Sequence, residues 1–227
     1  MSELFTTTEG AWGDGSVRLT MIGVVVTIVV ILALVIASAI IRQHKEEKKN
    51  RITTKQLVFS AAAMGLAMVC SLIKFANLPM GGSVTLFSML FIVLIGYWYG
   101  PYVGIMAGFA YGLLQFVIEP IFYTIPQMLF DYPLPFAALG LAGFFCNKKW
   151  GLQIGYVVGV IGRYIFHVLS GYLFFAAYAP EGMHPLVYSL GYNATYIVPE
   201  AVLTLILISI PPVAKALEYV KRQAINK

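Results

Sequence analysis

Charged residues are scarce in this sequence. Only 11% of its 227 residues are Asp, Glu, Lys or Arg, whereas 59% are hydrophobic. A soluble domain of this length carries roughly a quarter charged residues, so the composition excludes an ordinary soluble domain. Apolar stretches of about 18 residues or more recur instead, which is typical of membrane-spanning helices. Because these stretches are continuous rather than alternating, they favour helices over a membrane β-barrel.

Signature motifs of catalysis and nucleotide hydrolysis are also missing. The sequence contains no Gly-Lys dipeptide and hence no phosphate-binding loop of the form GxxxxGK[ST]. It contains neither GxSxG nor HExxH. The two cysteines and three histidines lack the spacing of metal ligands. We therefore expect no ATP hydrolysis by this chain itself, no metal site, no cofactor and no enzymatic activity.

Positive charge is confined to clusters and does not indicate a nucleic-acid-binding surface. Residues 42–55, 148–149 and 215–227 hold six, two and four of the 15 Lys and Arg residues, within a net charge of +5. If all three clusters lie in the cytoplasm, the positive-inside rule places the N-terminus outside and the C-terminus in the cytoplasm. We therefore expect a multi-pass protein of the cell membrane. In this topology Cys70 and Cys146 lie toward opposite faces, which argues against a disulfide.

The N-terminal part of the chain is predicted to carry one helix outside the main membrane domain. Residues 1–20 are polar and are expected to form an extracellular tail, whereas residues 21–41 are almost wholly aliphatic. A signal peptide is the alternative for this run, since Ala37-Ser38-Ala39 resembles a cleavage site. The acidic residues before the run, its length and the basic cytoplasmic linker at 42–55 favour a retained transmembrane helix.

The rest of the chain predicts an all-α membrane domain of six helices over residues 56–214, followed by a basic cytoplasmic tail over 215–227. Apolar runs bounded by turn residues or charges define the spans. We expect them at 56–76, 84–98, 102–118, 126–146, 152–177 and 191–213.

Small residues recur at four-residue spacing, which on helices produces flat stripes that allow close helix–helix contact. A glycine series over residues 100–112 has this spacing, and we interpret it as packing inside the bundle. Ala63 and Ala67 share the spacing. For these two alanines, contact with a partner subunit is the alternative to internal packing.

Asp131 is an acidic side chain within an apolar span. It lies near the outer end of the run 126–146, where a carboxylate costs up to roughly 3 kcal/mol by insertion scales. Pairing with Lys74, at the outer end of the span 56–76, is one explanation. Recognition of a cationic or amino-bearing ligand is the other.

His167 lies toward the outer end of the span 152–177 and shares one helix face with Arg163, Gly171 and Phe175. A lone buried histidine is either a satisfied core residue or a ligand contact. Here the face also carries aromatic residues and is directed at the Tyr188–Asn193 segment. A cation over an aromatic ring gains roughly 0.5 to 2 kcal/mol when desolvated. The sequence therefore predicts a pocket for a small cationic, aromatic ligand, with Asp131, His167, Asn193 and the aromatic residues Tyr123, Tyr132, Phe175 and Tyr188.

Arg163 and Glu200 are expected near the middle of the membrane on consecutive helices. An unpaired charge at that depth is hard to sustain, so we predict a structural ion pair between them. A role of this pair in transport is the alternative.

Several longer motifs carry a family resemblance. The segments DYPLPFAALGLAG (131–143), RYIFHVLSG (163–171), YAPEG (178–182) and VYSLGYN (187–193) occur in this order, after LPMGGSV (78–84). Together they resemble the thiamine-specific S component of energy-coupling factor (ECF) transporters. The resemblance covers about residues 56 to 214, so the run at 21–41 is an addition to which it assigns no role.

The resemblance implies a six-helix membrane subunit that binds thiamine from outside. It also implies docking onto a module of one transmembrane coupling protein and two ATPase subunits. The motif through which the family contacts the coupling protein falls on Ala63 and Ala67. The ligand-binding positions of the family fall on Asp131, Tyr132, His167, Phe175, Tyr188 and Asn193.

Two departures from the family pattern concern aromatic residues. Some members place a stacking Trp in the first core loop, but residues 77–83 contain none. A family Tyr is replaced by Ile121, with Tyr123 nearby as a stand-in. Two other functions remain open, namely an S component for another vitamin and an intramembrane enzyme that uses His167 and Asp131 as base and acid.

Overall fold

The computed structural model describes residues 6–7, 18–19, 53–78 and 82–225. The predicted helix at 21–41 lies outside the described residues, as do most of the tail before it and most of the linker after it. Strands β1 (Thr6–Thr7) and β2 (Arg18–Leu19) form a short antiparallel pair.

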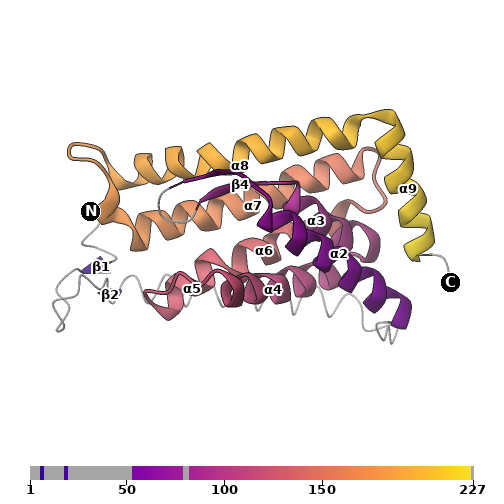
Figure 1. Cartoon of the computed structure of the whole chain (residues 1–227), viewed down its shortest axis with the longest axis horizontal. Coiled ribbons are helices and arrows are strands. Elements are labelled where there is room, and N and C mark those ends of the chain that lie inside the picture. Colours follow the sequence, from indigo (N-terminus) through magenta and orange to yellow (C-terminus); the bar gives the residue numbers. More distant parts are fainter. Residues whose placement is uncertain (1–5, 8–17, 20–52, 79–81, 226–227) are drawn as a thin grey trace.

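The described membrane domain is mostly helical, as the sequence predicts. Five of its helical segments are long and apolar enough to cross a membrane, and Ser88–Tyr99 is a shorter apolar helix. Two strands form a hairpin beside the helices (Figure 1). In chain order the elements are α2 (Thr54–Leu72), β3 (Lys74–Asn77), β4 (Ser83–Thr85), α3 (Ser88–Tyr99), α4 (Pro101–Ile118), α5 (Ile125–Asp131), α6 (Pro133–Leu139), η3 (Gly140–Phe145), α7 (Gly151–Phe174), η4 (Ala176–Tyr178), α8 (Pro185–Ser209) and α9 (Pro211–Ile225).

The core is centred on α3. Ile92, Val93 and Ile95 of this helix are fully buried, because α2, α4, η3 and α7 all pack around it. Figure 1 shows α7 and α8 side by side along most of their length, with α4, α5 and α6 in a second layer and α9 turning back across one end of the bundle.

Close helix contact in this bundle depends on glycine, as the glycine series predicts. A Cβ added at Gly108 would lie 2.2 Å from the Phe136 carbonyl oxygen, and one at Gly112 would lie 2.5 Å from the Tyr132 carbonyl oxygen. Any side chain at these positions would force α4 away from α6. The glycine positions therefore set the distance between α4 and the segment that carries Asp131.

Three predicted boundaries differ from the structure. Helix α2 ends at Leu72, because the chain turns there into the β3–β4 hairpin instead of continuing to residue 76. The predicted span 126–146 is divided into α5, α6 and η3, with a break at Tyr132 where Pro133 begins a new helix. Helix α8 begins at Pro185, six residues before the predicted start, since the His184 ring accepts a hydrogen bond from the Leu186 N–H at 3.2 Å.

Candidate ligand-binding site

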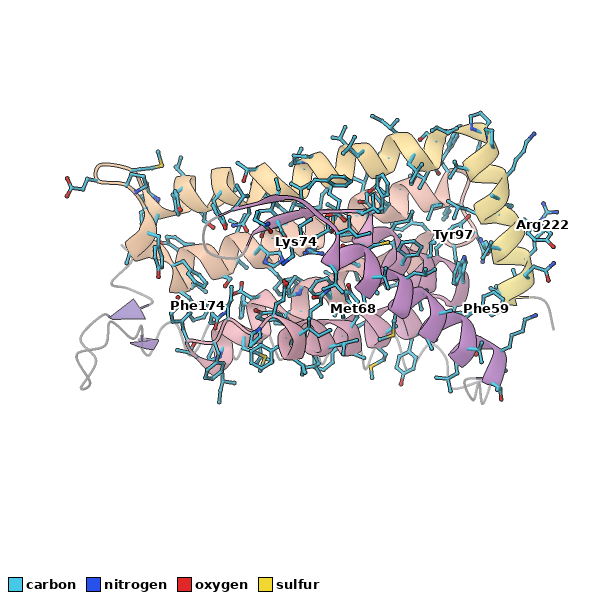
Figure 2. The ribbon with its side chains drawn as sticks, in the orientation of Figure 1. Phe59, Met68, Lys74, Tyr97, Phe174 and Arg222 are labelled. Atoms are coloured by element: carbon cyan, nitrogen blue, oxygen red, sulfur yellow. The ribbon has the colours of Figure 1, made fainter. Side chains whose placement is uncertain are left out.

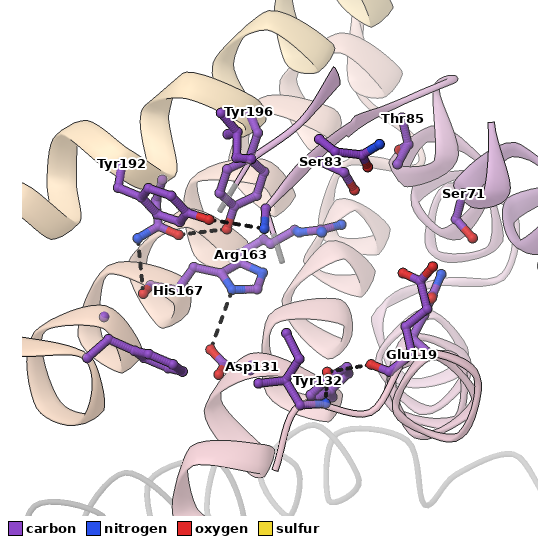
Figure 3. A pocket seen from close by; sticks show the side chains of 18 of the residues that line it. Ser71, Ser83, Thr85, Glu119, Asp131, Tyr132, Arg163, His167, Tyr192 and Tyr196 are labelled. Carbon is purple, nitrogen blue, oxygen red and sulfur yellow. Dashed lines mark hydrogen bonds and ion pairs between the residues drawn. The ribbon is translucent and has the colours of Figure 1, made fainter. Parts of the chain in front are cut away.

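A cavity of about 420 Å³ opens at the end of the bundle where α7 ends and α8 begins. Its wall is formed by the β3–β4 hairpin, the segment after α4, the break between α5 and α6, and facing sides of α7 and α8 (Figure 3). The volume lies within the range of small-molecule sites, roughly 300 to 1,000 Å³.

Six of the seven ligand-binding residues that the sequence predicts line this one cavity. They come from three separate parts of the chain and are Asp131, Tyr132, His167, Phe175, Tyr188 and Asn193. Tyr123 does not line the cavity but supports it, because its ring lies edge-on to the Phe175 ring at 5.4 Å between centroids. Its hydroxyl lies 3.5 Å from that of Tyr178, and this contact, with burial, raises the pKa of Tyr123. Binding by these residues stays a prediction, whereas their convergence is observed.

The Asp131 carboxyl group has two side-chain neighbours, Gln127 and His167. Its Oδ2 accepts a hydrogen bond from Gln127 Nε2 at 2.6 Å, and its Oδ1 lies 3.8 Å from His167 Nδ1. Gln127 is fully buried and donates also to the Ile121 carbonyl oxygen at 3.1 Å, which fixes its amide. The suggested pairing with Lys74 is wrong, since Lys74 forms an ion pair with Glu119 instead. Asp131 therefore has no Lys or Arg partner among the described residues, and its carboxyl group faces the cavity, where it can accept from a ligand.

The pair of Lys74 and Glu119 links the hairpin to the residue that follows α4. Figure 2 shows Lys74 in the space between the two layers, far from Arg222 at the opposite end of the bundle. Both paired side chains line the cavity, with Lys74 24% and Glu119 49% exposed. Sequence reasoning missed this contact, because the hairpin that brings Lys74 to Glu119 was not predicted.

Asn193 ties α7 to α8 in addition to lining the cavity. Its Nδ2 donates to the Ser189 carbonyl oxygen at 2.8 Å and to the His167 carbonyl oxygen at 3.3 Å. Its Oδ1 accepts from the Tyr196 hydroxyl at 2.6 Å. His167 Nε2 is buried without a hydrogen-bond partner among the described residues. That ring nitrogen is therefore available to a ligand in the cavity.

Two further tyrosines line the site: Tyr192 belongs to the Tyr188–Asn193 segment that the sequence predicts at the pocket, whereas Tyr196 was missed by sequence reasoning. Tyr192 stacks on Tyr188 at 6.0 Å between centroids, and Tyr196 meets Tyr192 edge-on at 5.9 Å. The Gly82 N–H donates to the Tyr192 hydroxyl at 3.1 Å, which joins the hairpin to α8. The four-residue spacing of the three tyrosines was the available signal. This spacing was not recognised as helical, because the predicted span begins at residue 191, after Tyr188.

The predicted ion pair between Arg163 and Glu200 is wrong. Glu200 caps the N-terminus of α3 instead, where its carboxylate accepts hydrogen bonds from the Thr85 and Met89 N–H groups at 3.2 and 3.3 Å. It also accepts from the Thr85 hydroxyl at 2.7 Å. The N-terminus of a helix favours an anion, and α3 has no side-chain cap of its own. Arg163 lies over the Phe136 ring at 4.3 Å from its centroid.

Ala63 and Ala67, for which partner contact was predicted with internal packing as the alternative, pack inside the bundle in this structure, and their contact with a partner stays a prediction. They are 3% and 0% exposed and pack in the core. The exposed small residues of α2 are Ala61, Ala62 and Gly65. A Cβ at Gly65 would meet no atom within 4 Å, so this side of the helix is open.

Comparisons with known proteins agree on one family. The model of the family described as "Thiamine transporter protein (Thia_YuaJ)" matches residues 57–219. The "Thiamine transporter ThiT" of Bacillus subtilis (strain 168) is 36% identical over 165 residues, which cover 66% of this chain and 84% of that protein. The protein of the same name from Lacticaseibacillus paracasei is 27% identical over 121 residues, or 46% of this chain and 60% of that protein.

A solved structure has the same fold. The structure described as "ThiT from Listeria monocytogenes" superimposes with a TM-score of 0.54 and 22% sequence identity. The superposition covers 71% of this chain and 94% of that chain.

Proposed function

The chain belongs to the thiamine transporter protein family, and on that premise we propose that it is the thiamine-binding membrane subunit of an energy-coupling factor importer. In this proposal the subunit captures thiamine from outside the cell. It then delivers thiamine inward together with a transmembrane coupling protein and two ATPase subunits. The ligand passes through chemically unchanged, as expected of a transporter rather than an enzyme.

The observation that carries this proposal is the convergence, in one cavity, of several aromatic rings and a carboxyl group without a Lys or Arg partner among the described residues. Asp131, His167 and Phe175 come from two helices, and Tyr188 and Asn193 from a third, yet all line the same space. Thiamine combines a flat aminopyrimidine with a permanently cationic thiazolium. A carboxylate complements both the amino group and the positive charge, and rings complement the flat heterocycles.

We assign the following roles within this site. Asp131 accepts a hydrogen bond from the ligand's amino group, and the free Nε2 of His167 hydrogen-bonds the ligand beside it. Phe175 and Tyr188 contact the heterocycles from opposite walls, with Tyr123 supporting the Phe175 ring. Asn193 holds α7 and α8 at the distance that the ligand requires.

The energy for uptake must come from other subunits, because the chain has no phosphate-binding loop. We propose that the coupling protein contacts the open side of α2, at Ala61, Ala62 and Gly65. Small residues there allow a partner helix to approach the backbone closely. We further propose that the basic α9 end faces the cytoplasm and the cavity faces outside, since Lys and Arg gather on the cytoplasmic side.

Calorimetric titration of the purified full chain with thiamine tests the central claim. We expect saturable binding of one thiamine per chain, and recovery of intact thiamine after denaturation. Absence of binding in folded protein would refute the proposal. Recovery of a chemically altered ligand would instead favour an enzyme.

A further inference from the structure

A basic and aromatic surface lies at the end of the bundle opposite the mouth of the cavity. Two segments form it, namely the turn 147–150 between η3 and α7 and the outer side of α9, and we name it the basic end surface. The turn and α9 together contain five basic residues and one acidic residue. Figure 2 shows Arg222 at this end, far from Lys74 of the cavity wall.

A buried lysine holds the two segments together. Lys221 is 8% exposed, and its Nζ donates a hydrogen bond to the Cys146 carbonyl oxygen at 2.6 Å while lying 3.7 Å from the centroid of the Tyr97 ring. Cys146 directly precedes the turn, and Tyr97 belongs to α3. Helix α9 also contacts α2 and α8, so it lies across the end of the bundle (Figure 1). Because α7 and α8 run along the bundle and span the membrane, α9 lies at the level of the membrane surface.

The outer side of α9 carries exposed cations and a ring. Lys215, Tyr219 and Arg222 are all exposed and follow one another at spacings of four and three residues, so they share one face. The Arg222 side chain is 70% exposed, and its contact with Glu218 at 3.7 Å is an exposed pair that contributes little. The apolar residues Leu217 and Val220 are partly buried on the opposite side. The charged face of α9 is therefore directed away from the bundle.

Trp150 indicates which medium meets this surface. Its indole is 63% exposed, and its backbone has a φ of 58°, a left-handed conformation that is costly for a bulky residue. The two residues before it, Lys148 and Lys149, are exposed as well. The turn is nevertheless ordered, because the Lys148 N–H donates to the Phe145 carbonyl oxygen and the Gly151 N–H to the Lys148 carbonyl oxygen, both at 3.0 Å. An exposed indole is favourable at the lipid–water boundary, where its ring meets apolar chains and its N–H meets polar headgroups.

We propose that the basic end surface binds anionic phospholipid headgroups of the leaflet that surrounds this end of the bundle. Lys and Arg side chains donate to the headgroup phosphate, and the rings of Trp150 and Tyr219 lie at the boundary with the acyl chains. A zwitterionic lipid carries its own ammonium group, so a lipid with net negative charge is preferred. Each basic residue near an anionic membrane surface strengthens the attraction about fivefold. This binding is independent of the ligand cavity.

Quenching of tryptophan fluorescence by brominated lipids tests the inference on the full chain. The protein is reconstituted in phosphatidylcholine vesicles in which a rising share of the lipid is replaced by dibrominated phosphatidylglycerol or dibrominated phosphatidylcholine. Bromine quenches an indole that it contacts, so the two quenching curves give the relative affinity of the two lipids beside Trp150. The variant Trp150→Phe provides the signal of the other tryptophans, which is subtracted.

We expect the unmodified chain to prefer phosphatidylglycerol over phosphatidylcholine at least about threefold, since several basic residues contribute. The double variant Lys148→Gln with Lys149→Gln and the double variant Lys215→Gln with Arg222→Gln should each lower this preference about twofold or more. Lys74→Gln is the matched control, because it removes a cation at the opposite end of the bundle, and it should leave the preference unchanged. All of these variants should remain folded, because the side chains changed at the basic end surface are exposed.

Several outcomes would overturn the inference. These are equal quenching of Trp150 by the two lipids, a preference that neither double variant lowers, and a preference that Lys74→Gln lowers as much. A preference abolished by inorganic phosphate, but not by chloride at equal ionic strength, would assign the surface to a free anion instead of a lipid. Thiamine titration of the same vesicles keeps the two claims separate, because neither double variant should change thiamine affinity. Absence of thiamine binding would contradict the proposed function and leave the lipid preference as it is.

Discussion

Replacement of Asp131 by Asn gives the sharpest test of the ligand site. The change keeps the shape of the side chain and removes its charge. In the structure Gln127 Nε2 donates to Asp131 Oδ2, and Gln127 is itself fixed by the Ile121 carbonyl oxygen. An asparagine would therefore direct its oxygen at Gln127 and its NH₂ group into the cavity. That NH₂ group would meet the amino group of the ligand, donor against donor.

The expected loss follows from the lost charge-assisted hydrogen bond. Such a bond is worth about 1.5 to 3 kcal/mol, and every 1.4 kcal/mol corresponds to a factor of about ten in affinity. We expect Asp131→Asn to weaken thiamine binding about 10- to 100-fold. The side chain is 19% exposed, so a small effect on folding is expected. Calorimetric titration measures the affinity, and thermal unfolding without ligand reports the stability.

A matched control separates the site from a general effect of charge. Glu181→Gln removes a carboxylate from the exposed turn between η4 and α8, outside the cavity. It should leave the affinity for thiamine unchanged. Equal affinities of Asp131→Asn and the unmodified chain, within about twofold, would show that Asp131 does not contact the ligand and would refute the reasoning.

Three further predictions concern the contact of Glu200 with the β3–β4 hairpin, the proposed partner surface on α2 and a tryptophan introduced at residue 175 as a fluorescent reporter. Glu200→Gln should lower stability by about 1 to 3 kcal/mol in thermal unfolding, because the amide NH₂ would face the donors of either Thr85 or Met89, which bind different oxygens of Glu200. An unchanged midpoint would contradict the capping role. Gly65→Trp should leave thiamine binding unchanged but abolish thiamine uptake by cells. Ala67→Trp, by contrast, should unfold the protein, because residue 67 is fully buried. Normal uptake with Gly65→Trp would exclude this docking surface. Phe175→Trp should bind thiamine with a change in tryptophan fluorescence, and a spectrum unaffected by ligand would place residue 175 away from it.

The helical fold could be predicted because lipid leaves the backbone few choices. Continuous apolar runs must form helices, since each backbone group needs an internal partner. Prolines and caps then decide where helices begin. Pro133 divides one predicted span, and the His184 ring that accepts from the Leu186 N–H begins α8 before the apolar run does. Hydropathy does not register either signal, so the boundaries at these places were missed.

Six side chains of the cavity could be predicted for a different reason. Asp131 and His167 are polar groups in apolar runs, where each needs a purpose, and aromatic residues recur around them at helical spacing. The hairpin wall could not be predicted in this way. Lys74–Asn77 and Ser83–Thr85 are too short to show an alternating pattern, and the glycines between them indicate only a turn. The contacts of Lys74 with Glu119 and of Gly82 with Tyr192 therefore could not be predicted either.

The ion pair between Arg163 and Glu200 was predicted because both residues were expected near the middle of the membrane. This prediction was wrong because a buried carboxylate can also be stabilised without a cation. The end of a helix offers free N–H groups and the positive end of the helix dipole, and Glu200 binds there without any cation. This choice has a consequence for the cavity. Glu200 anchors the hairpin strand β4 to α8, and it leaves the guanidinium of Arg163 without a carboxylate partner among the described residues. The same arrangement that closes one wall of the cavity thus leaves the Arg163 side chain at the cavity without a carboxylate partner among the described residues.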